Sequence, residues 1–488
     1  MNTPLRRVAL AVMGMIVLLL ANVTYIQVVS ADGYRSDPRN HRVLLDEYGR
    51  QRGQIIAGGL PLASSVPSGG ELRFQRQYLA GPVYAPVTGY YSLRYGSGGM
   101  ENAMDPVLNG SDERLFVRRL SDLITGREPS GGSVELTVNP AVQQVAYDAL
   151  ASRGYTGAAV ALRPDTGEIL AMVSTPSYDP NLLAIQDSEV QQAAWEEFTA
   201  DENDTPLTNR PVASIYPPGS TFKLVTTAAA LESGTATPET RLSAAPTITL
   251  DDTATPLPNF GNSRCGNGET ASLTEALARS CNTAFAQLAA RTGEEALRRQ
   301  AEQFGIGRPN LDVPLAVASS MIGDMPDPAA LQQSGIGQRD VAITPLQNAV
   351  IAATIANEGV RMRPQLVRNL LAPDFSSIES FEAEEVEEAM SRQTAEQITA
   401  MMIASEERTR GSGQIPGVTI ASKTGTAEHG DGEAPHAWYV AFAPAENPQV
   451  AVAVVVEDGG DRGAEATGAS VAAPIGRATI AAALRETP

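Results

Sequence analysis

A long apolar run near the start of the chain is the first pattern that predicts a structure. It extends from Val8 to Val29, carries no charged residue, and its 22 residues are enough to cross a bilayer as a helix. Arg6 and Arg7 precede the run and acidic residues follow it, which favours a cytoplasmic N-terminus with the rest of the chain outside the membrane. A cleaved signal peptide is the competing interpretation. Because the run is longer than an ordinary signal core and lacks a clean small-x-small cleavage site, we expect an uncleaved single-pass anchor.

Five short apolar segments farther along predict the strands of one sheet. Ala158–Leu162 and Glu168–Val173 flank Pro164-Asp165-Thr166-Gly167, whose turn chemistry is typical of a hairpin. The other three segments lie near the C-terminus: Val418–Ser422, Trp438–Ala443 and Val450–Val456. Strands from the two ends of one region predict a single antiparallel sheet.

The residues between these strands carry helix signals. Ser272 and Thr344 each begin a capping-box spacing, with Glu275 and Gln347 three residues later. Pro345 falls in the first turn of the second helix, where its missing N–H costs little. Strands at both ends and helices in the middle predict an α+β domain.

Patches rich in Gly, Ser and Pro divide the first third of the chain. The patch at residues 129–133 is the best domain boundary, because regular strand and helix signals begin just beyond it. We expect a cytoplasmic stub and transmembrane anchor over residues 1–30, a strand-containing pedestal module over residues 31–150, and the α+β domain over residues 151–488.

The charge balance excludes some functions. A formal net charge of −20 at pH 7, without a long run of lysine or arginine, argues against nucleic-acid binding. The acidic stretch at residues 379–388 is interpreted as a solvated helix, because nothing in it converges as metal ligands do. His429 and His436 are also a poor metal signal, and His436 is interpreted as structural. We therefore expect no metal and no cofactor.

Lysine usage points to chemistry. Only two of the 36 lysine and arginine residues are lysines, and they lie in Ser220-Thr221-Phe222-Lys223 and in Lys423-Thr424-Gly425. A guanidinium group cannot lose its proton in a protein, whereas a buried ammonium can. Lysine kept at these two positions alone indicates that they serve a reaction.

Ser220 is the candidate nucleophile. Tyr216-Pro217-Pro218-Gly219 cannot be helical throughout, so Ser220 is expected at a helix N-terminus with Lys223 one turn later on the same face. A lysine whose pKa is lowered by burial, or by a second cation such as Lys423, can accept the proton of the serine. The free N–H groups at a helix N-terminus favour negative charge that develops beside Ser220.

Ser280-Cys281-Asn282 completes an ordered set of three motifs: Ser-x-x-Lys, Ser-x-Asn and Lys-Thr-Gly. This set resembles that of the penicillin-recognising serine transferases. Further segments are similar to class B penicillin-binding proteins: residues 157–160, 165–172, 176–181, 216–219 and 436–438. The resemblance covers about residues 155–488. It implies a transpeptidase domain similar to that of penicillin-binding proteins and β-lactamases, with an antiparallel five-stranded sheet flanked by helices.

The resemblance implies a peptidoglycan D,D-transpeptidase that β-lactam antibiotics acylate. Ser220 would attack the carbonyl of the penultimate D-alanine in a stem peptide ending in D-Ala-D-Ala, with Lys223 as the general base. Ser280 would relay the proton to the leaving amine, and Asn282 would hold the acyl-side amide. An amine of a neighbouring stem peptide would then take the acyl group and form a crosslink.

The third motif would recognise the substrate. Lys423 with Thr424-Gly425-Thr426 would bind the terminal carboxylate by charge and hydroxyl contacts. Backbone N–H groups of Ser220 and Thr426 would form the oxyanion hole.

The pedestal resembles the family more loosely. Arg39-Asn40-His41-Arg42 and Arg52-Gly53-Gln54-Ile55 are similar to the arginine-containing signature of class B modules, but Ala57-Gly58-Gly59 replaces the usual Asp-Arg-Asn-Gly. The short module suits a subgroup like actinobacterial penicillin-binding protein A. The family also implies a polytopic glycan polymerase in the membrane as a partner.

The two cysteines allow two states. In an exported protein Cys265 and Cys281 could pair and close a loop of about 16 residues, which would stabilise the fold by about 3 kcal/mol in the chain-entropy model. Two free buried thiols are the alternative.

The same motifs also serve other proteins. A D,D-carboxypeptidase passes the acyl group to water, and a β-lactam sensor or scaffold keeps the site without turnover. The pedestal and anchor favour a transpeptidase over a β-lactamase, and no clear Glu-x-x-Leu-Asn loop lies between Ser280 and Lys423. A sensor would need a cytoplasmic signalling portion, and only seven residues precede the apolar run.

Overall fold

The structure is a computed structural model that describes residues 2–30, 49–69, 72–116, 124–126, 130–201, 205–309, 311, 313–409, 412–428 and 432–486. The first half of the predicted pedestal signature, at residues 39–42, and His429 lie outside the described residues.

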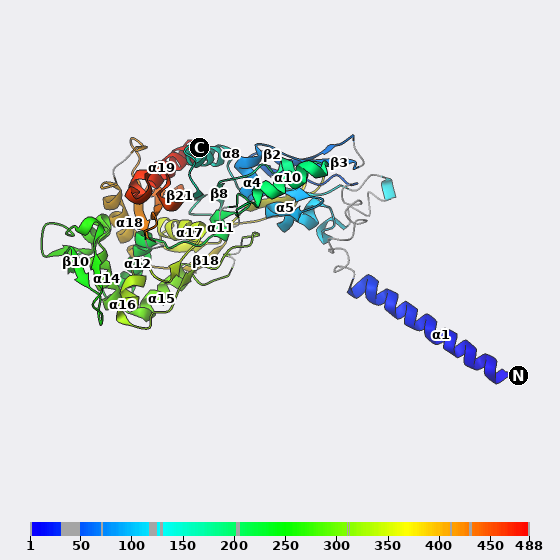
Figure 1. The fold of residues 1–488 in the computed structure, drawn as a ribbon, viewed down its shortest axis with the longest axis horizontal. Coiled ribbons are helices and arrows are strands. Elements are labelled where there is room, and N and C mark those ends of the chain that lie inside the picture. The colour runs from blue at the N-terminus through cyan, green and yellow to red at the C-terminus, as the bar shows by residue number, and fades with distance from the viewer. Residues whose placement is uncertain are drawn as a thin grey trace.

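The N-terminal helix projects from the body of the molecule (Figure 1). Helix α1 (Asn2–Thr24) continues into the π-helical turn η1 (Tyr25–Val29). Residues 3–28 form a helix that is long and apolar enough to cross a membrane, and its most apolar 18-residue window has a mean hydropathy of 2.2. The predicted apolar helix is therefore present.

The body is built on a five-stranded antiparallel sheet in the order β19-β20-β21-β7-β8. Its strands are β7 (Gly157–Leu162), β8 (Ile169–Thr175), β19 (Ala421–Ala427), β20 (His436–Ala443) and β21 (Val450–Val456). Helices cover both faces, which explains why β7, β20 and β21 are continuous apolar runs without polar alternation. The predicted sheet is confirmed. Strand β19 begins three residues later than predicted and extends beyond the predicted end through Lys-Thr-Gly-Thr, a polar segment that lacks an apolar strand pattern.

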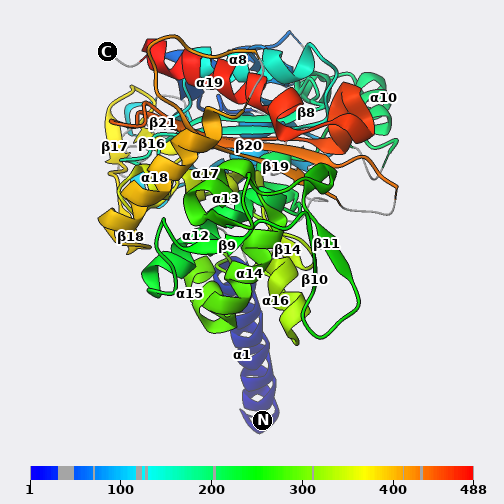
Figure 2. The same cartoon turned by 90° about the vertical axis from the view of Figure 1, so that its left-hand side faces the viewer.

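Two helical layers enclose this sheet (Figure 2). Helices α8 (Pro140–Ala151) and α19 (Ala473–Glu486) pack on one face. Helices α11 (Arg210–Ala213) and α17 (Pro345–Ala356) pack on the other, α18 (Arg392–Glu406) lies against β19, and α12 (Lys223–Glu232) packs against α18. Helix α17 is buried at every residue, as its apolar sequence requires.

A mainly helical region stands beyond α12 and carries the middle motif. Its helices are α13 (Leu273–Arg279), α14 (Asn282–Thr292), α15 (Glu294–Gln303) and α16 (Pro328–Ser334). Two-stranded ladders join β9 (Arg241–Ser243) to β12 (Thr270–Ser272), β10 (Thr247–Thr249) to β11 (Pro256–Pro258), and β13 (Met321–Ile322) to β14 (Val341–Ala342). Both predicted helix caps are confirmed: Ser272 Oγ accepts from the Glu275 N–H, and Thr344 Oγ1 accepts from the Gln347 N–H.

A six-stranded sheet in the order β17-β16-β6-β1-β2-β3 forms the base of the pedestal. Its strands are β1 (Ile55–Ala57), β2 (Leu60–Pro67), β3 (Phe74–Tyr78), β6 (Ser133–Leu136), β16 (Val367–Leu371) and β17 (Ser377–Ser380). The neighbouring elements are β4 (Tyr91–Ser92), β5 (Gly96–Ser97), α4 (Gly81–Thr88), α5 (Gly99–Ala103), α6 (Asp105–Leu108), α9 (Asn181–Ala184) and α10 (Ser188–Phe198). Two strands of this sheet thus come from late in the chain.

The prediction of a helix over residues 379–388 is wrong, because the segment contains strands. Strand β17 ends at Ser380, and β18 (Glu385–Glu388) pairs with β15 (Val360–Met362). The acidic side chains are accommodated by arginines on neighbouring segments, as in the Arg308–Glu387 ion pair at 3.0 Å. The charged residues correctly indicated that the segment is exposed. Its strand conformation could not be predicted from them, because it depends on the pairing of β18 with β15.

Arg52 of the pedestal signature belongs to a buried charge cluster. Arg52 Nε and Arg76 Nε donate to the two oxygens of Glu101 at 2.7 and 2.6 Å. The carboxylate is 0% exposed, and the Tyr78 hydroxyl also donates to it at 3.2 Å. Burial alone opposes ionisation, but the two guanidinium groups outweigh it and hold the pKa of Glu101 below its usual value.

Candidate active site

Ser220 stands on a tight turn at the start of α12. The short 3₁₀ helix η3 (Gly219–Phe222) precedes Lys223, so the candidate nucleophile lies one turn before the helix proper. Gly219 has a φ of 51° and its N–H donates to Gly337 O at 2.9 Å. A Cβ at Gly219 would lie 2.9 Å from Thr426 O. Glycine therefore allows the turn to approach β19 closely.

Lys223 contacts all of the middle motif. Its Nζ lies 3.1 Å from Ser220 Oγ, 2.8 Å from Ser280 O and 2.8 Å from Asn282 Oδ1. The side chain is 0% exposed, and the ammonium lies 5.5 Å from the centroid of the Phe285 ring. The predicted proximity of the serine and the first lysine is present in the structure.

Ser280 links the two lysines. Lys423 Nζ donates to Ser280 Oγ at 2.8 Å, and Lys223 Nζ lies 3.5 Å from the same oxygen. Ser280 has the left-handed φ of 61° at the C-terminus of α13, where the Cys281 N–H donates back to Ala276 O. This helix ending turns both the carbonyl and the hydroxyl of Ser280 toward Lys223.

Burial tunes both amines. Two effects lower the pKa of Lys223 well below its ordinary value: the larger is desolvation by burial, and the smaller is repulsion from Lys423. Desolvation lowers the pKa of Lys423 to about 7. The first amine can therefore exist without a proton at neutral pH, and the second sits near the midpoint of its titration.

The Lys-Thr-Gly segment forms the floor of the site on β19. Lys423 Nζ also donates to Thr424 O at 2.7 Å. A Cβ at Gly425 would lie 2.9 Å from Pro218 O and 3.0 Å from Trp438 Cβ. Trp438 Nε1 donates to Pro217 O at 3.0 Å. Glycine at position 425 thus lets the strand pack directly against the turn that carries Ser220.

A cleft of about 1260 Å³ opens above these residues. Among the residues that line it are Ser220, Ser280, Asn282, Thr424 and Thr426. The predicted oxyanion-hole residues, Ser220 and Thr426, therefore face the same space.

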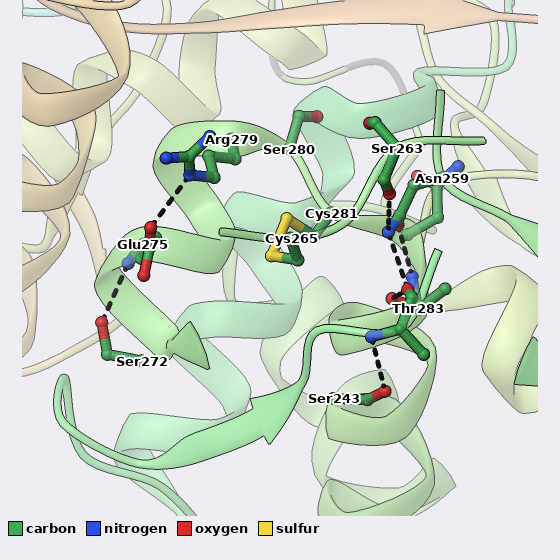
Figure 3. The surroundings of a disulfide bond; sticks show 12 residues. Ser243, Asn259, Ser263, Cys265, Ser272, Glu275, Arg279, Ser280, Cys281 and Thr283 are labelled. Atoms are coloured by element: carbon green, nitrogen blue, oxygen red, sulfur yellow. Dashed lines mark hydrogen bonds and ion pairs between the residues drawn. A yellow bond between two sulfur atoms is a disulfide. The ribbon is translucent and has the colours of Figure 1, made fainter. Parts of the chain in front are cut away.

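A disulfide lies beside the middle motif (Figure 3). Cys281 is bonded to Cys265, which precedes it by 16 residues. Ser280 points away from the sulfur atoms, while the Asn259 side chain accepts from the Thr283 N–H. Asn282 Nδ2 also donates to Pro258 O at 3.1 Å. The loop before Cys265 thereby holds the helix start that carries Asn282.

Two supporting networks were not predicted from the sequence. Tyr216 and Arg210 both donate to Glu457 Oε1, at 2.6 and 3.0 Å. Glu406 receives hydrogen bonds from Ser422, Tyr439 and Arg477. Glu457 lies 241 and 247 residues from its two donors, and Glu406 lies 16, 33 and 71 residues from its three donors, so no short motif indicated either network.

His436 occupies a structural position. Its ring contacts the Tyr216 ring at a centroid distance of 5.4 Å, and Nδ1 accepts from the Asp458 N–H at 3.3 Å. Among the described residues, no group of three or more His, Cys, Asp or Glu side chains could hold a metal ion.

Comparisons with known proteins identify relatives over the full length. A model of the penicillin binding protein transpeptidase domain matches residues 157–481, and one of the penicillin binding protein A dimerisation domain matches residues 52–134. The chain is 58% identical over 492 residues to peptidoglycan D,D-transpeptidase PbpA of Mycolicibacterium smegmatis, which covers 100% of both chains. It is 56% identical over 494 residues to the protein of that name from Mycobacterium tuberculosis, again with 100% coverage of both.

A solved structure agrees with the fold. The ceftriaxone acyl-enzyme complex of penicillin-binding protein A from M. tuberculosis superposes with a TM-score of 0.88 at 55% identity. The alignment covers 90% of this chain and 100% of that one.

Proposed function

This chain belongs to the penicillin-binding protein transpeptidase family, and from that premise we propose how its residues catalyse peptidoglycan D,D-transpeptidation. The family assignment makes it a class B, serine-type enzyme of cell-wall synthesis that β-lactams acylate. The observation that carries the residue roles is the set of contacts around Lys223 Nζ.

Lys223 acts as the general base. A neutral amine has two N–H donors and one lone pair. Ser280 O and Asn282 Oδ1 are both acceptors at 2.8 Å, so they take the two N–H groups. The lone pair is then left for the Ser220 hydroxyl at 3.1 Å, and the lowered pKa of Lys223 keeps that lone pair available.

Acylation then proceeds through a tetrahedral intermediate that carries an oxyanion. Ser220 Oγ bonds to the carbonyl carbon of the penultimate D-alanine while its proton moves to Lys223. The oxyanion is stabilised by the backbone N–H groups of Ser220 and Thr426. The C–N bond breaks, and the leaving D-alanine amine receives the proton through Ser280, which contacts both lysines.

Lys423 recognises the end of the donor peptide. Its ammonium, with the hydroxyls of Thr424 and Thr426, binds the terminal carboxylate, while Asn282 holds the acyl-side amide. An amine of a second stem peptide then attacks the carbonyl carbon of the acyl-enzyme, and its proton passes to Lys223. The ester bond to Ser220 Oγ breaks, and Lys223 returns the proton to Oγ. The product is a crosslink between two stem peptides.

A transfer assay tests this function. The full-length protein in detergent is incubated with a D-Ala-D-Ala thioester analogue and a D-amino acid acceptor. We expect the aminolysis product to exceed the hydrolysis product. Dominant hydrolysis would instead indicate a D,D-carboxypeptidase. Ser220→Ala is the control, and it should abolish both products as well as covalent labelling by fluorescent penicillin.

The anchor and the pedestal give the enzyme its place. We propose that the N-terminus is cytoplasmic, as Arg6 and Arg7 before the apolar helix favour, and that residues 31–150 hold the domain of residues 151–488 outside the membrane. Reporter fusions to the two ends of the protein test the orientation. A reporter that is active only outside the cell should be active at the C-terminus and silent at the N-terminus.

The partner at the membrane is a polytopic glycan polymerase. The apolar helix α1 and the pedestal support a complex in which one protein extends glycan strands and the other crosslinks them. Co-purification of the full-length protein with a co-expressed polymerase, compared with a version whose span is replaced by an unrelated one, tests this assignment. If equal amounts of polymerase co-purify with the native and the replaced span, α1 does not contribute to the contact with the polymerase.

A further inference from the structure

The carboxylate of Glu406, whose side chain is 12% exposed, contacts Ser422, the residue before Lys423 on β19. Successive side chains of a strand point to opposite faces, so Ser422 faces away from the side on which Lys423 meets Ser280. Ser422 is 0% exposed, and its hydroxyl donates to Glu406 Oε2. Glu406 is the last residue of α18. The residue before Lys423 is therefore tied to a separate element.

Glu406 gathers donors from three elements of the core. Besides Ser422 on β19, the Tyr439 hydroxyl on β20 donates to Oε2 at 3.1 Å. Arg477 on α19 donates from Nε and Nη2 to Oε1 at 2.8 and 2.7 Å. Burial and, to a smaller extent, the charge of Glu406 raise the pKa of Tyr439. The Tyr439 hydroxyl therefore keeps its proton and donates it in the hydrogen bond to Glu406. The carboxylate is thus the common point of attachment for the edge of the sheet.

The ion pair between Arg477 and Glu406 also contacts the chain segment that lines the cleft. The fully buried Arg477 also donates to Thr409 O at 2.7 Å and to Ser412 O at 3.1 Å. Thr409 lines the cleft, as do Ser405 and Arg408 at the end of α18. One charged pair therefore fixes both the substrate-binding strand and the chain segment that faces it.

The position of β19 matters because its lysine works at short range. Lys423 Nζ lies 2.8 Å from Ser280 Oγ, and a misplacement of about 1 Å can lower a rate by about 10². We propose that Glu406 is a positioning residue that acts through Ser422 to set where Lys423 meets the terminal carboxylate of the substrate. This inference rests on the role of Lys423 proposed above.

Ser422→Ala is the most informative variant. It removes one hydroxyl and leaves Glu406 paired with Tyr439 and Arg477, so the core charge stays satisfied. Glu406→Gln is less suitable, because it leaves the buried guanidinium of Arg477 without its counter-charge. Ser422→Thr restores a hydroxyl. Glu407→Gln is the matched control, since Glu407 is the exposed next residue.

The experiment compares two probes on the full-length protein in detergent. One probe is a D-alanyl thioester whose leaving group ends in a carboxylate, and the other is its methyl ester. For Ser422→Ala we expect acylation by the carboxylate probe to fall about tenfold to a hundredfold more than acylation by the ester. Ser422→Thr should recover most of the ratio, and Glu407→Gln should keep it unchanged. Because both probes use one preparation, an unfolded fraction cancels in the ratio.

Each other outcome overturns a specific statement. An equal loss with both probes, or no loss with either, shows that Glu406 and Ser422 do not position Lys423 for the carboxylate. A wild-type protein that does not prefer the carboxylate probe overturns the role of Lys423 itself, and this inference with it. If Ser422→Ala keeps the wild-type preference for the carboxylate probe over the ester, this inference is overturned, but the proposed role of Lys423 is not.

Discussion

At the scale of single residues, the proposed chemistry gives two amines different tasks. As a general base Lys223 would need a lone pair, and as a carboxylate-binding group Lys423 would need a charge, yet both side chains are almost completely buried. Their motifs and spacing could be recognised in the sequence because lysine is so rare in this chain. Their depressed pKa values could not be derived from the sequence in the same detail, since burial depends on the surrounding helices.

Lys223→Arg should lose acylation although it keeps the positive charge. A guanidinium group cannot accept the proton of Ser220 under these conditions. General-base assistance contributes about 10² to 10⁴ in rate, so labelling by fluorescent penicillin should slow by at least about 10². Stopped-time labelling of the purified variant measures this loss. Arg308→Lys, an exchange at an exposed surface ion pair, is the control and should label normally.

The charge of Lys423 should make acylation sensitive to pH. With a pKa of about 7 in the free enzyme, Lys423 is charged at lower pH and loses its charge as the pH rises through that value. The second-order rate constant for a carboxylate-bearing thioester should therefore fall above about pH 7, because this constant reports on the free enzyme. In Lys423→Arg the rate is lower throughout, but this alkaline fall should disappear. A flat alkaline profile in the wild-type protein would contradict the assignment.

At the scale of elements, the turn before α12 and the strand β19 approach more closely than side chains normally permit. Gly219 and Gly425 stand where the backbones meet. The sequence predicted that a strand and a helix start would carry the two motifs. It did not predict that β19 extends to Ala427, because hydroxyl and amine side chains facing a cleft do not resemble a strand pattern.

Gly425→Ala should separate these two elements. The added Cβ would lie 2.9 Å from Pro218 O, so the strand or the turn must move. If the shift approaches about 1 Å, acylation should fall by about 10² while the overall fold persists. Rates of penicillin labelling and far-UV circular dichroism give the two readouts. Gly69→Ala, at a site with no neighbour within 4 Å, should behave as the wild-type protein does.

At the scale of the whole molecule, the pedestal and the transpeptidase domain share structure. Strands β16 and β17 belong to the second half of the chain, yet they complete the pedestal sheet. Local sequence patterns predicted the five strands of the catalytic sheet, because each strand contains or adjoins an apolar run. They misassigned the acidic segment at residues 379–388, because its charged residues show no apolar alternation, although β17 pairs with the preceding β16 and β18 pairs with β15.

The buried charge cluster of the pedestal should matter for stability. Glu101→Gln removes the charge that balances Arg52 and Arg76, and breaking such a buried pair typically costs about 3 to 5 kcal/mol. Urea denaturation of the full-length protein in detergent should show a correspondingly lower free energy of unfolding. Glu113→Gln, at an exposed position of the same module, should change it by less than about 0.5 kcal/mol.

The strand order of the pedestal also constrains how this protein can be made. Strand β6 lies between β1 and β16, and β16 begins only at Val367. Until the chain has been synthesised as far as Val367, β6 has no neighbour on that side. A fragment that stops before Val367 would therefore contain a pedestal with an open sheet edge, prone to aggregation or proteolysis.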